Sequence, residues 1–259
     1  MSVSQQYHDL ITKELRRISE EGVTILWACE SGSRAWGFES SDSDYDVHFI
    51  YSRHRDDYCR VSPLRDVIEM PISDELDISG WDISKALGLL RKSNPPLLEW
   101  LQSPIVYDQF EGFKESFWEL CKQYFCPRSC MYHYMSMVKR NSRAYLDADQ
   151  IRLKRYFYML RPLLSVEWIS VYGTVAPMQF GDLLDEFFPE GEIRSIIDKL
   201  LIHKREGKEL GEALPIPLLS KYILSRFESF TEVVKGTEFN REWDKLDDYF
   251  RTIINQVSN

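Results

Sequence analysis

The sequence predicts an α/β (α+β) fold, in which a short mixed β-sheet with flanking helices is followed by a mostly α-helical part. Before residue 110, short apolar runs of strand length alternate with amphipathic segments of helix length. After it, strand signals nearly vanish and long helical periodicities take over. The 259 residues are enough for one large or two modest domains with a sizeable core. We therefore expect two domains, over residues 1–109 and 110–259.

The N-terminal region begins with an amphipathic helix over residues 5–21, whose apolar positions recur at helical spacing and which Gly22 ends. An uninterrupted apolar and β-branched run then predicts a buried strand over residues 23–30. Serine and glycine follow as a turn that leads into a helix within residues 31–37. Further strands are expected over residues 45–51, 65–70, 75–79 and, more briefly, 104–107.

Capping and helix-starting residues mark the helices that follow. Asp82 is expected to cap a helix from Ile83 to about Lys92. Asn94 and the two prolines after it end that helix and start another, which continues through Leu101. In the second part of the chain, the clearest helical periodicities cover residues 151–170 and 192–204.

Composition excludes several classes of protein. A formal net charge of −9 argues against a protein that coats nucleic acid. No apolar run approaches the roughly 18 residues that a membrane helix needs. The polar N-terminal segment lacks the basic-then-apolar layout of a signal peptide. We therefore expect a cytoplasmic protein with no membrane partner.

Positive charge is concentrated between residues 128 and 161, where the only acids are Asp147 and Asp149. The basic residues of this stretch are Arg128, Lys139, Arg140, Arg143, Arg152, Lys154, Arg155 and Arg161. A local basic surface of this kind suits a polyphosphate or an RNA end, although a solvated helix face has the same composition.

The pattern that points to chemistry begins after the first strand, at Gly32-Ser33. Glycine lets the backbone turn tightly and approach a ligand, and a helix that starts there directs free N–H groups toward a phosphate. Ser33 adds a hydroxyl donor, and Arg34 adds a positive charge. These residues are therefore candidates for binding phosphate.

Two carboxylates, Asp44 and Asp46, stand at the start of the next expected strand. Alternate residues of a strand share a face, so the two side chains are expected to lie side by side. A divalent cation would remove their mutual repulsion, and hard oxygen ligands suit Mg²⁺. The apolar residues that follow Asp46 anchor the strand in a core, which leaves the acids at its solvent end.

Two metal ions would need a third acid. We choose Asp77, because both its neighbours are apolar and its side chain therefore faces the other way, toward the first two acids. Glu75 has the same parity in the strand and is the main rival.

These motifs follow one another in a fixed order: Gly-Ser, a gap of about ten residues, Asp-x-Asp leading into a strand, and a later acid in a strand. This order resembles that of the polymerase-β nucleotidyltransferase superfamily. The narrower pattern is similar to its minimal members associated with RNA repair pathways. The resemblance covers most of residues 22–170. It is carried by residues 32–37, 43–47, 76–82, Lys85, 93–96, 99–101 and 103–107, and more weakly by Lys154, Tyr158, residues 160–161 and Trp168.

This resemblance implies that residues 1–109 form a polymerase-β-like nucleotidyltransferase domain. Its reaction would transfer a nucleoside monophosphate from an NTP, with ATP as the expected donor, to an acceptor hydroxyl and release pyrophosphate. By analogy, Asp44, Asp46 and Asp77 would be catalytic and would hold two Mg²⁺ or Mn²⁺ ions about 4 Å apart. The phosphate-binding candidates are Gly32, Ser33, Arg34 and Ser43.

Three residues of the helical part are candidates for contacts to the nucleotide. Lys154, Tyr158 and Arg161 recur at i, i+4 and i+7, so they share one face of a helix. Lys154 and Arg161 are expected to contact the triphosphate, and Tyr158 to stack on a base. An ordinary amphipathic helix would show the same spacing.

We expect the acceptor to be an RNA end, such as that of a tRNA, because the resembling family is associated with RNA repair and the chain carries a local basic surface. A protein that receives AMP, a small-molecule acceptor and a non-catalytic nucleotide-binding module are alternatives. A helical ribonuclease is a further alternative, because Arg128 and His133 have the spacing seen in small helical ribonuclease domains.

Overall fold

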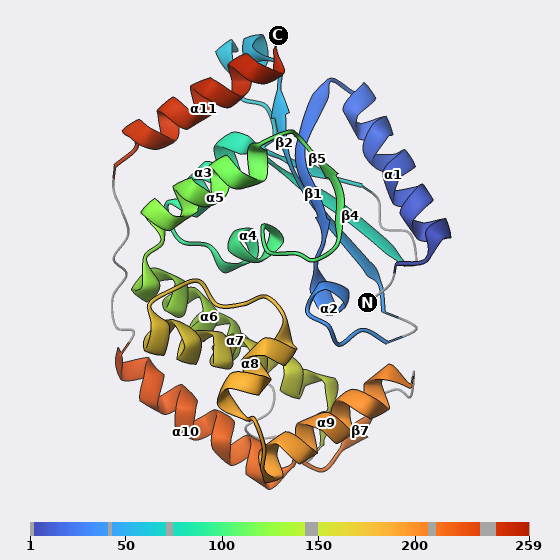
Figure 1. Ribbon diagram of the computed structural model, residues 1–259, viewed down its shortest axis with the longest axis vertical. Coiled ribbons are helices and arrows are strands. Elements are labelled where there is room, and N and C mark those ends of the chain that lie inside the picture. Colours follow the sequence, from blue (N-terminus) through green and yellow to red (C-terminus); the bar gives the residue numbers. More distant parts are fainter. Residues whose placement is uncertain are drawn as a thin grey trace.

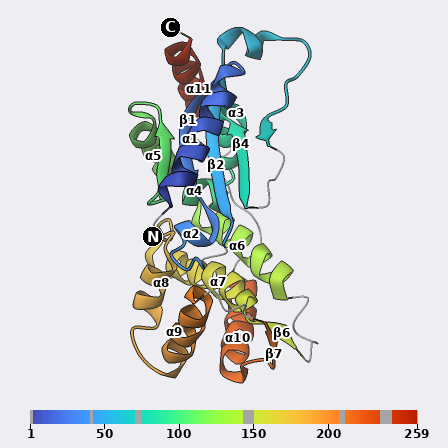
Figure 2. The same cartoon turned by 90° about the vertical axis from the view of Figure 1, so that its right-hand side faces the viewer.

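The computed structural model describes residues 3–40, 43–70, 75–142, 150–206, 211–233 and 242–258. Their elements form a five-stranded sheet covered by helices, together with a second group of helices (Figure 1). The sheet occupies one end of an elongated molecule, and the helices between residues 127 and 233 occupy the other (Figure 2). The predicted α/β (α+β) fold, a short mixed sheet followed by a mostly helical part, is confirmed.

The sheet contains the strands β1 (Val23–Glu30), β2 (Tyr45–Arg53), β3 (Val67–Glu69), β4 (Leu76–Asp82) and β5 (Val106–Gln109). Their order is β3-β4-β2-β1-β5. The pair β2–β4 is parallel and the other neighbours are antiparallel, so the sheet is mixed. Each expected strand is present, although β5 begins later than expected. Pro71, between the expected strands at 65–70 and 75–79, lies outside the described residues.

One face of the sheet is covered by α1 (Gln5–Glu20), the helix expected from its apolar periodicity. Its buried residues Ile11, Leu15 and Ile18 pack in one cluster with side chains of β1, β2 and β4. Gly22 ends the helix with a φ of 93°, a left-handed conformation that glycine adopts at little cost.

The other face is covered by α3 (Ile83–Leu90), α4 (Pro95–Trp100) and α5 (Phe113–Tyr124). Figure 1 shows these three helices on the side opposite α1. The Asp82 carboxylate accepts a hydrogen bond from the Ser84 backbone N at 2.8 Å, which confirms the expected cap of α3. Asn94 caps α4 in the same way, through the backbone N of Leu97 at 3.2 Å.

The second group of helices contains α6 (Pro127–Ser142), α7 (Lys154–Tyr172), α8 (Phe180–Phe187), α9 (Glu192–Arg205) and α10 (Pro217–Val233). The helix expected over 151–170 begins later, at Lys154, because Ile151–Arg152 form the strand β6, paired with β7 (Glu212–Ala213). Within the described ranges, no helix combines the length and apolar character needed to cross a membrane.

The last described helix, α11 (Asp244–Val257), lies back against the sheet end of the molecule, as Figure 1 shows. Phe250 packs edge-on against Tyr58, with ring centroids 4.9 Å apart. The Tyr249 hydroxyl lies 2.9 Å from Oγ of Ser116 in α5. Two helices beyond residue 109 therefore complete the part built around the sheet, while the division into domains at that point stays a prediction.

Candidate active site

Asp46 and Asp77 are direct register partners in the parallel pair β2–β4. In its strand, each acid alternates with buried residues that pack under α1. The half-buried side chains of Asp46 and Asp77 therefore share the face of the sheet opposite α1. His48, two positions beyond Asp46, stacks on Trp100 of α4, which identifies this as the face covered by α3–α5. Asp44 is exposed immediately before β2. The structure thus places the three predicted acids at one end of two adjacent strands.

Asp44 and Asp77 both act electrostatically on Asp46. Burial, and to a smaller extent the negative charges of Asp44 and Asp77, raise the pKa of Asp46 to about 6. No three acidic, histidine or cysteine side chains of the described residues stand close enough together to form a complete metal-binding group by themselves. Mg²⁺ commonly takes only one or two protein carboxylates together with substrate phosphates, so the arrangement fits a site completed by a triphosphate.

The rival acid Glu75 lies just before β4 and is exposed. Its carboxylate accepts a hydrogen bond from the Tyr7 hydroxyl of α1, the helix on the opposite face of the sheet. Glu75 is not among the charges that shift the pKa of Asp46, whereas Asp77 is. The geometry therefore favours Asp77 as the third acid.

Gly32 passes so close to Asp46 that a side chain has no room there. A β-carbon on Gly32 would lie 1.8 Å from Oδ2 of Asp46. The φ of Gly32 is also positive, at 57°, which disfavours other residues. The expected helix after it is the single turn α2 (Gly32–Ala35). Glycine is thus required here by contact with the second acid as well as by the turn.

Ser33, Ser43 and Arg34 hold together the loop that precedes β2. Ser33 Oγ donates to Ser43 Oγ at 3.1 Å. Arg34 donates from Nη2 to the Ser43 carbonyl at 2.6 Å and from Nε to the Asp44 carbonyl at 3.2 Å. Its guanidinium also lies 3.9 Å from the ring centroid of Tyr45. Because Arg34 is buried in these contacts, the geometry favours a positioning role over the predicted phosphate contact.

Glu30 is a site residue that the sequence analysis missed. This fully buried carboxylate accepts hydrogen bonds from the Asp46 backbone N at 3.0 Å and from the Tyr107 hydroxyl. Burial raises its pKa to about 7, although these two hydrogen bonds partly oppose the shift. Glu30 therefore holds the backbone at Asp46 in place through this hydrogen bond. The available signal was an acidic residue at the end of an otherwise apolar strand.

A cavity of about 500 Å³ lies beside the acids and is bordered by Gly32 and Asp46. The helical part contributes Arg140 and Asn141 of α6 to its polar lining. Most of its surface is apolar, and its aromatic residues are Trp36, His48, Trp81, Trp100, Phe157 and Tyr158. The cavity thus joins the sheet end and the helical end of the molecule.

Three of these rings pack together along the sheet. The rings of His48 and Trp100 stack with centroids 4.5 Å apart at an interplanar angle of 14°, and those of Trp81 and Trp100 lie 3.9 Å apart, tilted at 31°. His48 Nδ1 and Ser79 Oγ share a hydrogen bond of 2.8 Å. Burial lowers the pKa of His48, which favours the neutral ring. His48 and Trp81 have the same strand parity as the acids, which was the signal that sequence analysis left unused.

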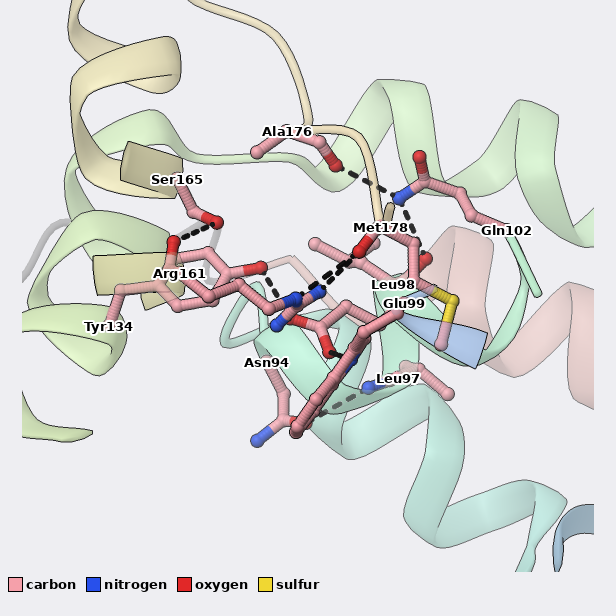
Figure 3. Close-up of polar contacts among 11 residues, drawn as sticks. Asn94, Leu97, Leu98, Glu99, Gln102, Tyr134, Arg161, Ser165, Ala176 and Met178 are labelled. Atoms are coloured by element: carbon pink, nitrogen blue, oxygen red, sulfur yellow. Dashed lines mark hydrogen bonds and ion pairs between the residues drawn. The ribbon is translucent and has the colours of Figure 1, made fainter. Parts of the chain in front are cut away.

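Arg161 borders the cavity, but its guanidinium is engaged elsewhere. Nη1 pairs with Glu99 Oε1 of α4 at 3.0 Å, and Nη2 and Nε donate to the Met178 carbonyl at 2.9 and 3.2 Å (Figure 3). Glu99 also accepts from Tyr134 at 2.7 Å and from the Trp36 indole at 3.3 Å. Arg161 is only 4% exposed. This geometry favours a structural link between α4 and α7 over the predicted triphosphate contact.

Tyr158 and Lys154 lie on the outer side of α7. Tyr158 is 38% exposed, borders the cavity and meets Trp36 edge-on at 6.0 Å. Burial raises the pKa of its hydroxyl, and the charges of Asp46 and Asp44 raise it further. The structure therefore brings Tyr158 near the acids. Lys154 is exposed at the start of α7, one helical turn before Tyr158, and does not border the cavity.

The residues behind the ribonuclease alternative lie at the start of α6. His133 is half-buried, and burial is the largest cause that lowers the pKa of its imidazole. Neither Arg128 nor His133 borders the cavity beside the acids.

Comparisons with known proteins show which family this chain resembles. A family model described as the RNA repair pathway DNA polymerase beta family matches residues 7–252. The chain is 43% identical over 248 residues to the uncharacterized protein YcgL of Bacillus subtilis (strain 168), with 95% of each chain covered. A crystal structure of a nucleotidyltransferase-like protein from Exiguobacterium sibiricum 255-15 is 13% identical, with a TM-score of 0.29 over 86% of this chain and 79% of that one.

Proposed function

Because the chain belongs to the RNA repair pathway DNA polymerase beta family and is a nucleotidyltransferase, we propose that it transfers a nucleoside monophosphate from an NTP to the hydroxyl of an RNA end. The acceptor oxygen forms a bond to the α-phosphorus. The bond between that phosphorus and the bridging oxygen breaks, and pyrophosphate leaves with the electron pair. The hydroxyl proton passes to a carboxylate of the site, for which Asp77 is our candidate.

The observation that carries this proposal is the juxtaposition of Asp46 and Asp77 on adjacent parallel strands, with Asp44 next to them. These three side chains would hold divalent metal ions. Such ions, when bound, activate the acceptor hydroxyl and neutralise charge on the triphosphate. The chain itself supplies Asp46 and Asp77 side by side, with the backbone at Asp46 held by Glu30 and that at Asp44 held by Arg34.

The phosphates are proposed to lie over Gly32 and Ser33. Gly32 presents only backbone toward Asp46, so a phosphate can approach the acids without a side chain in the way. The Ser33 hydroxyl, now paired with Ser43, is positioned at the start of the same turn. This arrangement supports the assignment of both serines to the phosphate side of the site.

An RNA acceptor is supported by the family description and by the basic residues on the helical side of the cavity. Arg140 borders the cavity, and Lys154 is exposed one turn from Tyr158. These cations suit a phosphodiester backbone that approaches the acids from the helical end.

Radiolabel transfer tests the proposed function. The full chain is incubated with Mg²⁺, each α-labelled NTP in turn and either tRNA-sized RNA or cell-extract protein, beside the Asp44→Ala/Asp46→Ala variant. Label in RNA that disappears in the variant and on chelation of the metal supports the proposal. Label in protein instead would replace the acceptor by a polypeptide. Binding of NTP without transfer or pyrophosphate release would leave a nucleotide-binding module.

A further inference from the structure

The loop between α2 and β2 joins the proposed phosphate turn to the acids, and the helical part of the molecule holds it. The Trp36 carbonyl accepts a hydrogen bond from the Phe180 backbone N of α8 at 2.9 Å. Phe38 is buried and stacks on Phe157 of α7, with ring centroids 5.3 Å apart. The conformation of this loop therefore depends on helices that follow much later in the chain.

Two cations at the end of α9 contact the same loop. Arg205 Nη2 donates to the Gly37 carbonyl at 3.1 Å, and Lys204 Nζ donates to Ser40 Oγ at 3.4 Å. The Lys204 ammonium also lies 5.5 Å from the ring centroid of Phe38. Cations in the last turn stabilise a helix whichever way they point, because they complement its dipole. The direction of these two toward one loop therefore calls for a second reason.

A chain of three serine hydroxyls, here called the serine relay, leads from Lys204 to the proposed phosphate turn. Ser40 Oγ lies 3.0 Å from Ser43 Oγ, and the Ser40 backbone N donates to the same oxygen at 2.9 Å. Ser43 Oγ lies in turn 3.1 Å from Ser33 Oγ. Because an ammonium group only donates, Ser40 Oγ accepts from Lys204 and keeps its own proton for Ser43. Hydrogen bonds in such a chain polarise one another, so a charge at one end acts on the other.

The position of Lys204 decides which way the serine relay donates. Ser43 Oγ has one proton and two acceptor sites. The Ser40 backbone N occupies one of these sites, and the Ser40 hydroxyl, directed by Lys204, occupies the other. Ser43 then donates its own proton to Ser33, and the Ser33 proton is left for a ligand. Lys204 thereby favours the state in which the turn donates to an anion.

We propose that Lys204 is a positioning residue of the active site. Acting through the serine relay, it orients the Ser33 hydroxyl to donate a hydrogen bond to a phosphate of the donor NTP. Arg205 supports this role by fixing the same loop. The proposal rests on the proposed function and deepens it, because it makes the end of α9 part of the phosphate site without direct contact to the ligand.

Binding without turnover separates this proposal from the proposed function. Calorimetry on the full chain, with Ca²⁺ in place of Mg²⁺, measures the affinities of ATP and of inorganic tripolyphosphate. The variants are Lys204→Met, which removes the ammonium but keeps an unbranched side chain over Phe38, Ser40→Ala, and the two combined. Lys204→Arg keeps a cation and tests for rescue. Lys199→Met is the matched control, because Lys199 is exposed on α9 and points about 140° away around the helix. Thermal melting verifies that each variant is folded.

Lys204→Met and Ser40→Ala should each weaken the binding of tripolyphosphate and ATP by about 3- to 10-fold, because each breaks one link of the chain. The combined variant should be weaker than the poorer single variant by no more than about twofold, because both changes break the same chain. Lys204→Arg should retain most of the affinity, and Lys199→Met should be silent. In the transfer assay, Lys204→Met should raise KM for the NTP by the same factor and change kcat by less than about twofold.

The proposal is overturned if Lys204→Met lowers the melting temperature but leaves both affinities unchanged, or if Lys204→Arg is as weak as Lys204→Met. Multiplying losses in the combined variant would also overturn it, because Lys204 would then contact the phosphates directly instead of acting through Ser40. A wild-type chain that binds neither ATP nor tripolyphosphate would overturn it as well. Binding with the expected dependence in a protein that transfers no label would contradict the proposed function alone. Label transfer with an unchanged KM in Lys204→Met would contradict this inference alone.

Discussion

Arg161 Nη1 lies 3.0 Å from Glu99 Oε1, and both side chains are almost completely buried (Figure 3). Removing one partner leaves the other as an unpaired buried charge. We expect Glu99→Ala to lower the free energy of unfolding by about 3–5 kcal/mol. Urea denaturation measures the change. The control is Glu69→Ala, which breaks an exposed pair with Arg65 and should cost less than about 1 kcal/mol. Equal losses for the two variants would contradict a structural role for the buried pair.

Gly32→Ala should inactivate the protein. The new β-carbon would overlap Oδ2 of Asp46, so this carboxylate must leave its present position in the site. We expect kcat/KM to fall at least about 100-fold, as for other small displacements of reacting groups. Gly37→Ala is the matched control, because Gly37 also has a positive φ, of 85°, but nothing lies within 4 Å of its β-carbon position. It should lose about 1 kcal/mol of stability and keep most of its activity.

Replacing the acids one at a time tests the assignment of the third carboxylate. Asp77→Asn should lower the transfer rate by at least about 1,000-fold, because its charge is needed beside Asp46 for metal binding and proton acceptance. Glu75→Gln should change it less than about threefold, because Glu75 bonds Tyr7 away from the site. Initial rates of pyrophosphate release measure both. The reverse order of effects would assign the third position to Glu75.

The buried Glu30 predicts how stability depends on pH. Its pKa is near 4.5 in an unfolded chain and about 7 in the folded one, so between these values the folded state binds more protons than the unfolded state. Stability should therefore fall as pH rises from about 4.5 through 7. Glu30→Gln removes this contribution. Between pH 5 and pH 8, wild type should lose on the order of 1–3 kcal/mol more than the variant in urea unfolding. Parallel pH profiles would contradict the prediction.

The sequence predicted those features that depend on local rules. Strand parity predicted the face of the sheet on which Asp77 lies, and capping chemistry correctly predicted the role of Asp82. Both follow from residues near in sequence, because a strand or a helix start fixes the direction of its own side chains.

Features that depend on long-range packing were not predicted. Spacing on α7 suggested a ligand role for Arg161, but its partner Glu99 is 62 residues earlier in the chain. The role of Glu30 went unpredicted, because the Tyr107 hydroxyl that donates a hydrogen bond to it lies 77 residues later. The aromatic cavity draws on six elements, α2, β2, β4, α4, α6 and α7, that no single periodicity connects.

The return of α11 to the sheet affects how the chain matures during synthesis. Ser116 and the Tyr249 that meets it are 133 residues apart, and Leu246 and Ile253 belong to the same core as α3 and α5. A ribosome therefore releases the strands, together with α1 and α3–α5, long before α11 exists to complete the core that it shares with α3 and α5. The part built around the sheet therefore cannot complete its core in the order of synthesis and must wait for α11. Acid-bearing nascent chains should therefore stay protease-sensitive until α11 has emerged.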